Sequence, residues 1–135
     1  MGTMHAEYLG NLQTSCTHDT SNVRVLTDPA RDKGGQGAGF APTDLCAAAL
    51  ATCMMTIMGR TAQTHQINVT GMRATAEMRM AEPPKRIGSI RVDVYLPGGL
   101  GEKERALLER AANLCPVHAS LHPDIAQEMV FHYGG

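Results

Sequence analysis

The sequence predicts an α+β fold in which antiparallel sheets pack around a buried central helix. Three observations support this class. A stretch between residues 42 and 64 is apolar on every side of a helix, segments of alternating apolar and polar residues lie before and after it, and an amphipathic helical pattern follows near residue 105. The 135 residues match the usual size of one domain, so residues 1–135 are expected to form a single domain.

The first expected element is a β-hairpin near the N-terminus. Its two strands are Met4 to Leu9 and Asn22 to Thr27, short runs that contain β-branched and aromatic residues. A glycine-rich tract from Gly34 to Gly39 then separates this hairpin from the next element.

The central helix is expected to begin at Pro42 and to extend to about Thr64. Proline is favoured in a first helical turn, and the acidic Asp44 there suits the positive end of the helix dipole. The longest uncharged run, Leu45 to Met58, has 14 residues, fewer than the roughly 20 that a bilayer span needs. The pattern therefore indicates a buried helix and no membrane segment.

A long antiparallel hairpin is expected after this helix. Residues from Ile67 to Met80 alternate as in a half-solvated strand, and a change of parity predicts a bulge near Gly71. The segment Pro83 to Arg86 turns the chain, and Ile90 to Leu96 alternates as the returning strand.

The last expected elements are an amphipathic helix, Glu102 to Leu114, a helical turn, Val117 to Leu121, and a strand, Ala126 to Tyr133. Because Pro116 disfavours a helical Cys115, Cys115 is expected at the N-cap of the helical turn. Free N–H groups there stabilise a thiolate, so a lowered Cys115 pKa is expected. The element order is then ββ, α, ββ, α, β.

Charge and cysteine content narrow the function classes. With 12 basic and 13 acidic side chains, the chain lacks the basic surplus of a nucleic-acid-binding protein. The first residues lack a signal-peptide pattern, so a cytoplasmic protein is expected. Cysteines of cytoplasmic proteins are more often reactive, metal-binding or buried than joined in structural disulfides. The chain has four: Cys16, Cys46, Cys53 and Cys115.

Two motifs resemble the OsmC/Ohr family of hydroperoxide-resistance proteins. One runs from Gly39 through Asp44 to Cys53, and the other from Asn113 to His118. The resemblance includes the element order and covers nearly the whole chain. It implies an intertwined homodimer whose two thiols meet at the subunit interface and reduce organic hydroperoxides, with Cys53 as the peroxidatic and Cys115 as the resolving residue.

The chemistry implied by this resemblance needs no metal or cofactor. The Cys53 thiolate attacks the peroxide, an alcohol leaves, and the sulfenic acid condenses with Cys115 to a disulfide that an external thiol or dithiol reduces. Well-characterised members of the family hold the thiolate with a glutamate and an arginine. Thr43 stands at the glutamate position, and the neighbouring Asp44 is the candidate acid.

The arginine that supports the thiolate in the family is also missing from its usual segment in this sequence. The matching segment, Asn11 to Ser15, contains no arginine, which leaves Arg24, Arg31 and Arg86 as candidates for the supporting cation. The main alternative is therefore a non-catalytic OsmC-like protein that binds a small apolar or thiol-reactive ligand at the dimer interface.

Two further interpretations rest on short motifs. Gly35-x-Gly37-x-Gly39 lies between a strand and a helix, as in dinucleotide sites, but Pro42 stands where the third glycine is needed.

The second motif is a set of possible zinc ligands. His118 and His122 follow Cys115 at helical spacing, and with Cys53 they could ligate zinc. Pro123 is expected to end this helical turn and displace His122, which favours the other interpretation, that both histidines are solvated.

Overall fold

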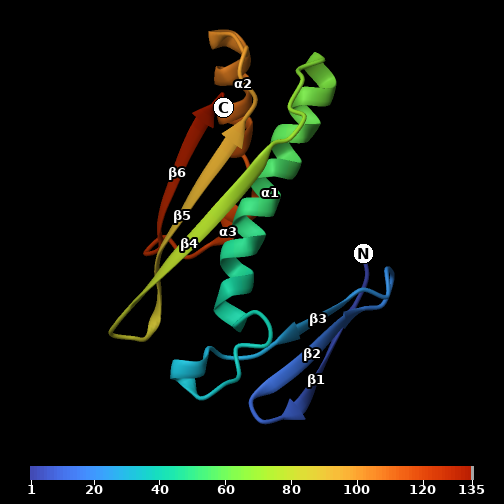
Figure 1. The fold of residues 1–135 in the computed structure, drawn as a ribbon, viewed down its shortest axis with the longest axis vertical. Coiled ribbons are helices and arrows are strands. Elements are labelled where there is room, and N and C mark those ends of the chain that lie inside the picture. Colours follow the sequence, from blue (N-terminus) through green and yellow to red (C-terminus); the bar gives the residue numbers. More distant parts are fainter. Residues whose placement is uncertain (135) are drawn as a thin grey trace. The chain divides into compact units, whose positions relative to one another are not determined.

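The computed structural model describes residues 1–134, which divide into two compact units, residues 1–46 and residues 47–134. Each unit contains one three-stranded sheet. Helix α1 (Pro42–His65) begins in the first unit and runs through the second (Figure 1). The predicted α+β class is confirmed.

The first unit contains one strand more than the sequence predicts. Its antiparallel sheet has the order β1 (Met4–Gly10), β2 (Gln13–His18) and β3 (Arg24–Thr27). The expected direct pairing of segments 4–9 and 22–27 is wrong, because β2 lies between them. A polar strand such as β2 gives no apolar alternation that would reveal it.

The glycine-rich tract is organised by a buried carboxylate. Asp28, only 1% exposed, accepts hydrogen bonds from the backbone N–H groups of Gln36 (3.1 Å) and Ala38 (2.9 Å). The bond from Ala38 is the largest cause of a lowered Asp28 pKa. A Cβ at Gly35 would lie 2.0 Å from the Pro29 carbonyl oxygen. The backbone N–H groups of Gln36 and Ala38 therefore bind the Asp28 carboxylate. In a dinucleotide site, N–H groups of such a loop would bind the phosphate instead.

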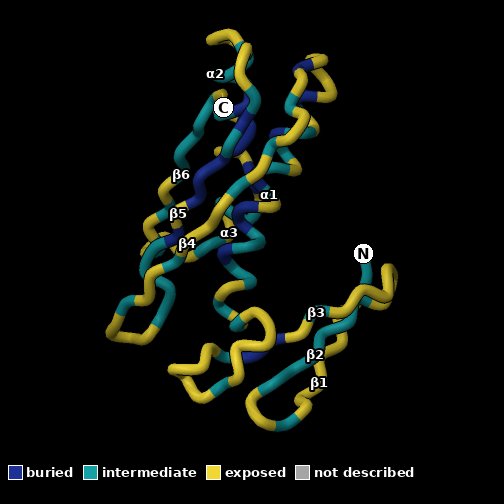
Figure 2. Tube along the Cα trace, in the orientation of Figure 1, coloured by how far each residue is buried: buried dark blue, intermediate teal, exposed yellow. Residues whose placement is uncertain are grey.

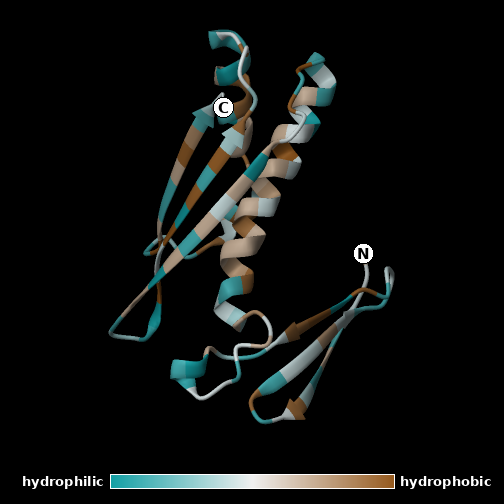
Figure 3. Cartoon of the chain, viewed as in Figure 1, coloured by the Kyte–Doolittle hydropathy of each residue, from teal (hydrophilic) through white to brown (hydrophobic). Residues whose placement is uncertain are grey.

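Helix α1 confirms the predicted central helix. It begins at Pro42, ends at His65, and its apolar surface is visible in Figure 3. By length and a mean hydropathy of 1.4, α1 would also suit a membrane span, but a soluble core helix passes the same test. In the second unit, α1 contributes to a core shared with the sheet and the later helices: Ala47, Leu50, Ala51, Met54, Met58, Ala62, Ile90, Val92, Val94, Leu96, Leu108, Ala112 and Cys115.

The sheet of the second unit has the order β4 (Arg73–Ala81), β5 (Arg86–Leu96) and β6 (Ala126–Tyr133). Strands β4 and β5 form the predicted antiparallel hairpin. The bulge expected near Gly71 is wrong. Gly71, at φ +82°, lies in a turn before β4, and the register shifts between Arg79 and Met80.

Strand β6 has the predicted bounds but the opposite direction from the one expected. It pairs in parallel with β5, from Ser89 opposite Ala126 to Leu96 opposite Tyr133. Helices α2 (Glu102–Ala112) and α3 (Pro116–Ser120) connect the two strands. Such a helical crossover returns the chain to the same end of the sheet, so the next strand runs parallel.

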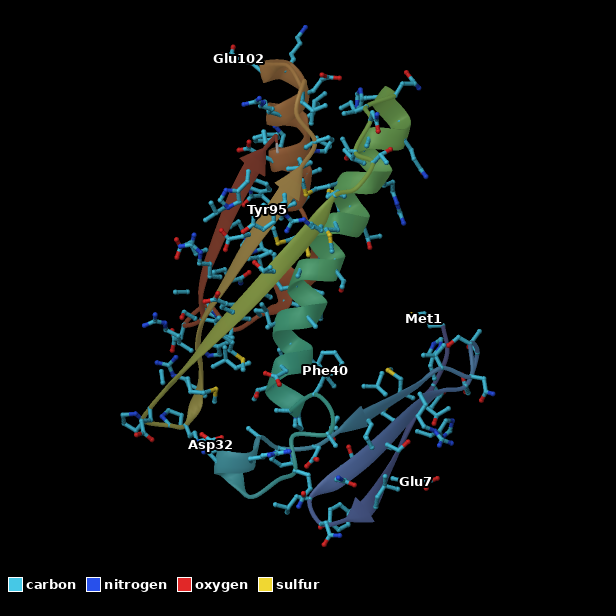
Figure 4. The ribbon with its side chains drawn as sticks, viewed as in Figure 1. Met1, Glu7, Asp32, Phe40, Tyr95 and Glu102 are labelled. Carbon is cyan, nitrogen blue, oxygen red and sulfur yellow. The ribbon has the colours of Figure 1, made fainter. Side chains whose placement is uncertain are left out.

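The face of this sheet opposite the core carries an ion-pair network. Arg91 forms two hydrogen bonds to Asp93, at 2.9 and 3.1 Å, and His132 Nε2 lies 2.8 Å from the Asp93 carboxylate. Tyr95, labelled in Figure 4, stacks on the His132 ring, and the Arg73 guanidinium lies over Tyr95. The hydrogen bonds from Arg91 and then His132 lower the Asp93 pKa to about 2.

The network predicts a specific acid dependence of folding stability. Because the folded-state pKa of Asp93 is below its ordinary value of 3.8, its contribution is complete above about pH 4 and is lost as the pH falls toward 2. Urea unfolding at pH 7, 4 and 2.5 should show a smaller acid loss in Asp93→Asn than in the wild type. Asp124→Asn, at an exposed position, is the control. An unchanged acid loss in Asp93→Asn would contradict this assignment.

Candidate active site

Cys53 and Cys115 come from different elements of the second unit. Cys53 lies on α1 and is half-buried against the hydrophobic core. Cys115 is fully buried, with 0% exposure, at the N-cap of α3. Its extended backbone (φ −60°, ψ 126°) precedes Pro116, which confirms the predicted N-cap position.

The structure brings the two thiols together. The Cys115 thiol lies near enough to the Cys53 side chain for Cys53 to raise its pKa, although the two residues are 62 positions apart in the sequence. The Cys115 sulfur also accepts a hydrogen bond from the His118 backbone N–H at 3.5 Å, and the Val117 N–H points to it as well. All four cysteines are free thiols in the structure.

Burial changes the acidity of Cys115 in the direction opposite to the one the sequence predicts. Desolvation is the largest cause of a raised Cys115 pKa, and the hydrogen bond to Cys53 adds to it. The N–H groups of His118 and Val117 lower the pKa, but by less. Cys115 is therefore a thiol near neutral pH, and its S–H can donate a hydrogen bond to the Cys53 sulfur.

The histidines near Cys115 do not gather around its sulfur. The His118 ring Nδ1 lies 2.5 Å from Gln127 Oε1. His122 is exposed, and its Nδ1 accepts a hydrogen bond from the Asp124 N–H at 3.0 Å. Within residues 1–134, no three His, Cys, Asp or Glu side chains are grouped so that they could hold a metal ion. The zinc hypothesis thus gains no support from the placement of these residues.

The side chains proposed to support the Cys53 thiolate form hydrogen bonds with backbone groups. Asp44 is exposed in the first turn of α1, where its carboxylate accepts a hydrogen bond from the Ala41 N–H at 2.9 Å. Arg31 donates to the Gln36 carbonyl oxygen and Arg86 to the Ile87 carbonyl oxygen. A catalytic role for Asp44 remains a prediction.

The remaining candidate, Arg24, is exposed on β3.

Gln127 is a residue of the site that the sequence analysis missed. It lies on β6 in the same row as Met129, Phe131 and Tyr133, which pack against the core. The sequence does mark Gln127, because it is the one polar residue in a row of apolar residues. A polar side chain on a buried face needs a hydrogen-bond partner.

Comparisons with known proteins show the family of the chain. The family model for OsmC-like proteins matches residues 34–129. No curated protein matches the chain. A solved structure from Psychrobacter arcticus 273-4, named for osmotic stress induction and a detoxification response, is 37% identical. The alignment covers 98% of this chain and 96% of that one, with a TM-score of 0.93.

Two more distant structures share the fold. An organic hydroperoxide resistance protein OsmC from Legionella pneumophila is 20% identical, with 96% of each chain covered and a TM-score of 0.72. An organic hydroperoxide resistance protein from Elizabethkingia anophelis is 18% identical, with 98% and 97% covered and a TM-score of 0.73. From the family-model match and the 37% identity over nearly the full length, the chain belongs to the OsmC-like protein family.

Proposed function

We propose that the protein is a thiol-dependent reductase of organic hydroperoxides, with Cys53 as the peroxidatic and Cys115 as the resolving residue. The contact between these two thiols is the observation that carries the proposal. Two structures with the same fold bear the name of organic hydroperoxide resistance proteins, which supports this class of substrate.

The different burial of the two thiols supports these two roles. Cys53 is partly exposed and can meet a peroxide, whereas Cys115 is fully buried. The Cys53 thiolate attacks the terminal peroxide oxygen, the O–O bond breaks, and the departing alkoxide takes a proton and leaves as an alcohol. A protonated Cys115 supports this step by donating its hydrogen bond to the Cys53 sulfur.

The second step joins the two sulfur atoms. Cys115 attacks the Cys53 sulfenic acid, the S–O bond breaks, and the hydroxyl group takes the Cys115 proton and leaves as water. An external dithiol then reduces the Cys53–Cys115 disulfide and is itself oxidised to a disulfide. This cycle uses two electrons and regenerates both thiols, without a metal or cofactor.

The surroundings of the thiols favour an apolar peroxide. Cys53 packs against a core of aliphatic and methionine side chains, whose contact with an organic group is favourable. The test is peroxide consumption by the wild-type protein with cumene hydroperoxide or hydrogen peroxide, each with dithiothreitol or glutathione. We expect turnover with cumene hydroperoxide and dithiothreitol. No thiol-dependent consumption with any pair would contradict the proposal.

The alternative is a non-catalytic protein that binds a small apolar or thiol-reactive ligand near the same cysteines. One observation favours it: in residues 47–134, no hydrogen bond links an arginine of this unit to either thiol. A binding protein would react once with a thiol-reactive compound and show no turnover in the peroxide assay.

We also propose a cytoplasmic homodimer. The only buried residues of the first unit are the polar Thr27 and Asp28, so this unit lacks a hydrophobic core of its own (Figure 2). It exposes many large apolar side chains, which a second copy of the chain would cover: Met4, Tyr8, Leu9, Leu12, Val23, Leu26 and Phe40.

Dimer formation predicts a solution mass of twice 14.5 kDa. Light scattering at micromolar concentration should give this doubled mass for the wild type. Leu26→Glu should shift the population toward the monomer, because it places a charge on the exposed apolar surface. Glu7→Gln, which removes an exposed charge in the same unit, is the control. A monomer mass for the wild type would contradict the homodimer.

A further inference from the structure

Helix α3, which follows Cys115, is short, and its Val117 packs against the hydrophobic core. It is only five residues long, and at its two ends the Ala119 N–H donates to the Cys115 carbonyl oxygen and the Leu121 N–H to the Val117 carbonyl oxygen. A helix this short is not stable by itself, so its orientation depends on contacts with other elements.

One side chain of the sheet holds α3 at two points. Gln127 Oε1 lies 2.5 Å from the His118 ring Nδ1, and Gln127 Nε2 donates to the His118 carbonyl oxygen at 3.1 Å. The second bond fixes the amide orientation, so Oε1 is the acceptor and Nδ1–H the donor. Gln127 therefore restrains both the ring and the backbone of His118.

His118 connects this restraint to the resolving thiol. Its backbone N–H donates to the Cys115 sulfur at 3.5 Å, and the Cys115 thiol in turn lies near the Cys53 side chain. A rotation of α3 that moved the His118 N–H would remove this hydrogen bond to the Cys115 sulfur. The path from Gln127 to Cys115 contains no residue that would touch a peroxide in the proposed reaction.

We propose that Gln127 is a positioning residue that holds Cys115 in place for attack on Cys53. The inference rests on the proposed roles of the two cysteines. It assigns Gln127 to disulfide closure and not to the first reaction of Cys53. Loss of its two hydrogen bonds is expected to slow closure by about tenfold.

A disulfide reagent tests this step without a peroxide. In a Cys16→Ser, Cys46→Ser background, the Cys53 thiolate attacks 5,5′-dithiobis(2-nitrobenzoate), forms a mixed disulfide and releases one thionitrobenzoate. Cys115 then loses its proton to solvent, attacks the Cys53 sulfur and releases the second thionitrobenzoate. Stopped-flow absorbance resolves the two releases.

Gln127→Leu, which keeps the size of the side chain and removes both bonds, should leave the first release within twofold and slow the second about tenfold. Gln127→Glu can still accept a hydrogen bond from the His118 ring, so its rate of second release should lie between those of the wild type and Gln127→Leu. Gln63→Leu, at an exposed position on α1, is the matched control.

A merely structural role would change both releases or the urea unfolding transition. Equal slowing of both releases, or an unchanged second release in Gln127→Leu, would overturn the positioning role. Failure of the peroxide assay would contradict the proposed function separately, because this reagent requires only the two thiols.

Discussion

Replacing Cys53 with serine is expected to lower thiol-dependent consumption of organic peroxide by about 100-fold or more. A serine hydroxyl stays protonated near neutral pH and is a poor nucleophile toward a peroxide oxygen, whereas a thiolate is a strong one. The two side chains are similar in size, so the core around α1 should tolerate the change. Initial rates with cumene hydroperoxide and dithiothreitol measure the effect.

The matched control is Cys46→Ser, seven residues earlier on α1 and also half-buried. This variant should keep its rate within about twofold, because Cys46 has no part in the proposed cycle. Comparable losses in both variants would indicate a general effect on α1. Retention of more than a tenth of the wild-type rate in Cys53→Ser would contradict the peroxidatic role.

Replacing Cys115 with serine is expected to leave the sulfenic acid of Cys53 without its partner. One equivalent of cumene hydroperoxide should then give one sulfenic acid per chain, which dimedone labels at Cys53. The wild type should be labelled about tenfold less, since the adjacent Cys115 converts the sulfenic acid to a disulfide. Mass spectrometry of the labelled peptide measures this difference.

Cys16→Ser serves as the control for this labelling, since Cys16 lies on β2 in the first unit. It should behave as the wild type. Equal labelling of the wild type and Cys115→Ser would show that Cys115 does not resolve the intermediate. Labelling at a cysteine other than Cys53 would contradict the assignment of the first step.

Local signals predict several elements closely. Pro42 and the apolar run after it give the start of α1, and Pro116 places Cys115 before α3. The alternation from Ala126 to Tyr133 gives the bounds of β6. The direction of β6 depends on where the crossover returns the chain. Alternation is the same for both directions, so the pattern alone could not predict it.

The site shows the same division between local and tertiary effects. The N-cap position of Cys115 predicts that backbone N–H groups donate to its sulfur, as the structure shows. Burial of this sulfur is a tertiary effect, and it raises the Cys115 pKa by more than the N–H groups lower it. The resemblance to a known family paired Cys53 with Cys115. Gln127 was missed because its partner, His118, lies on another element, and only the fold brings the two together.

The most direct test of the Cys53–Cys115 pair is peptide mapping of the reduced wild-type protein after one equivalent of cumene hydroperoxide. Because the Cys53 and Cys115 thiols lie near each other, we expect a single new disulfide between them. Cys16 and Cys46 should remain reduced. A Cys46–Cys53 disulfide, or an unmodified Cys53, would contradict the account.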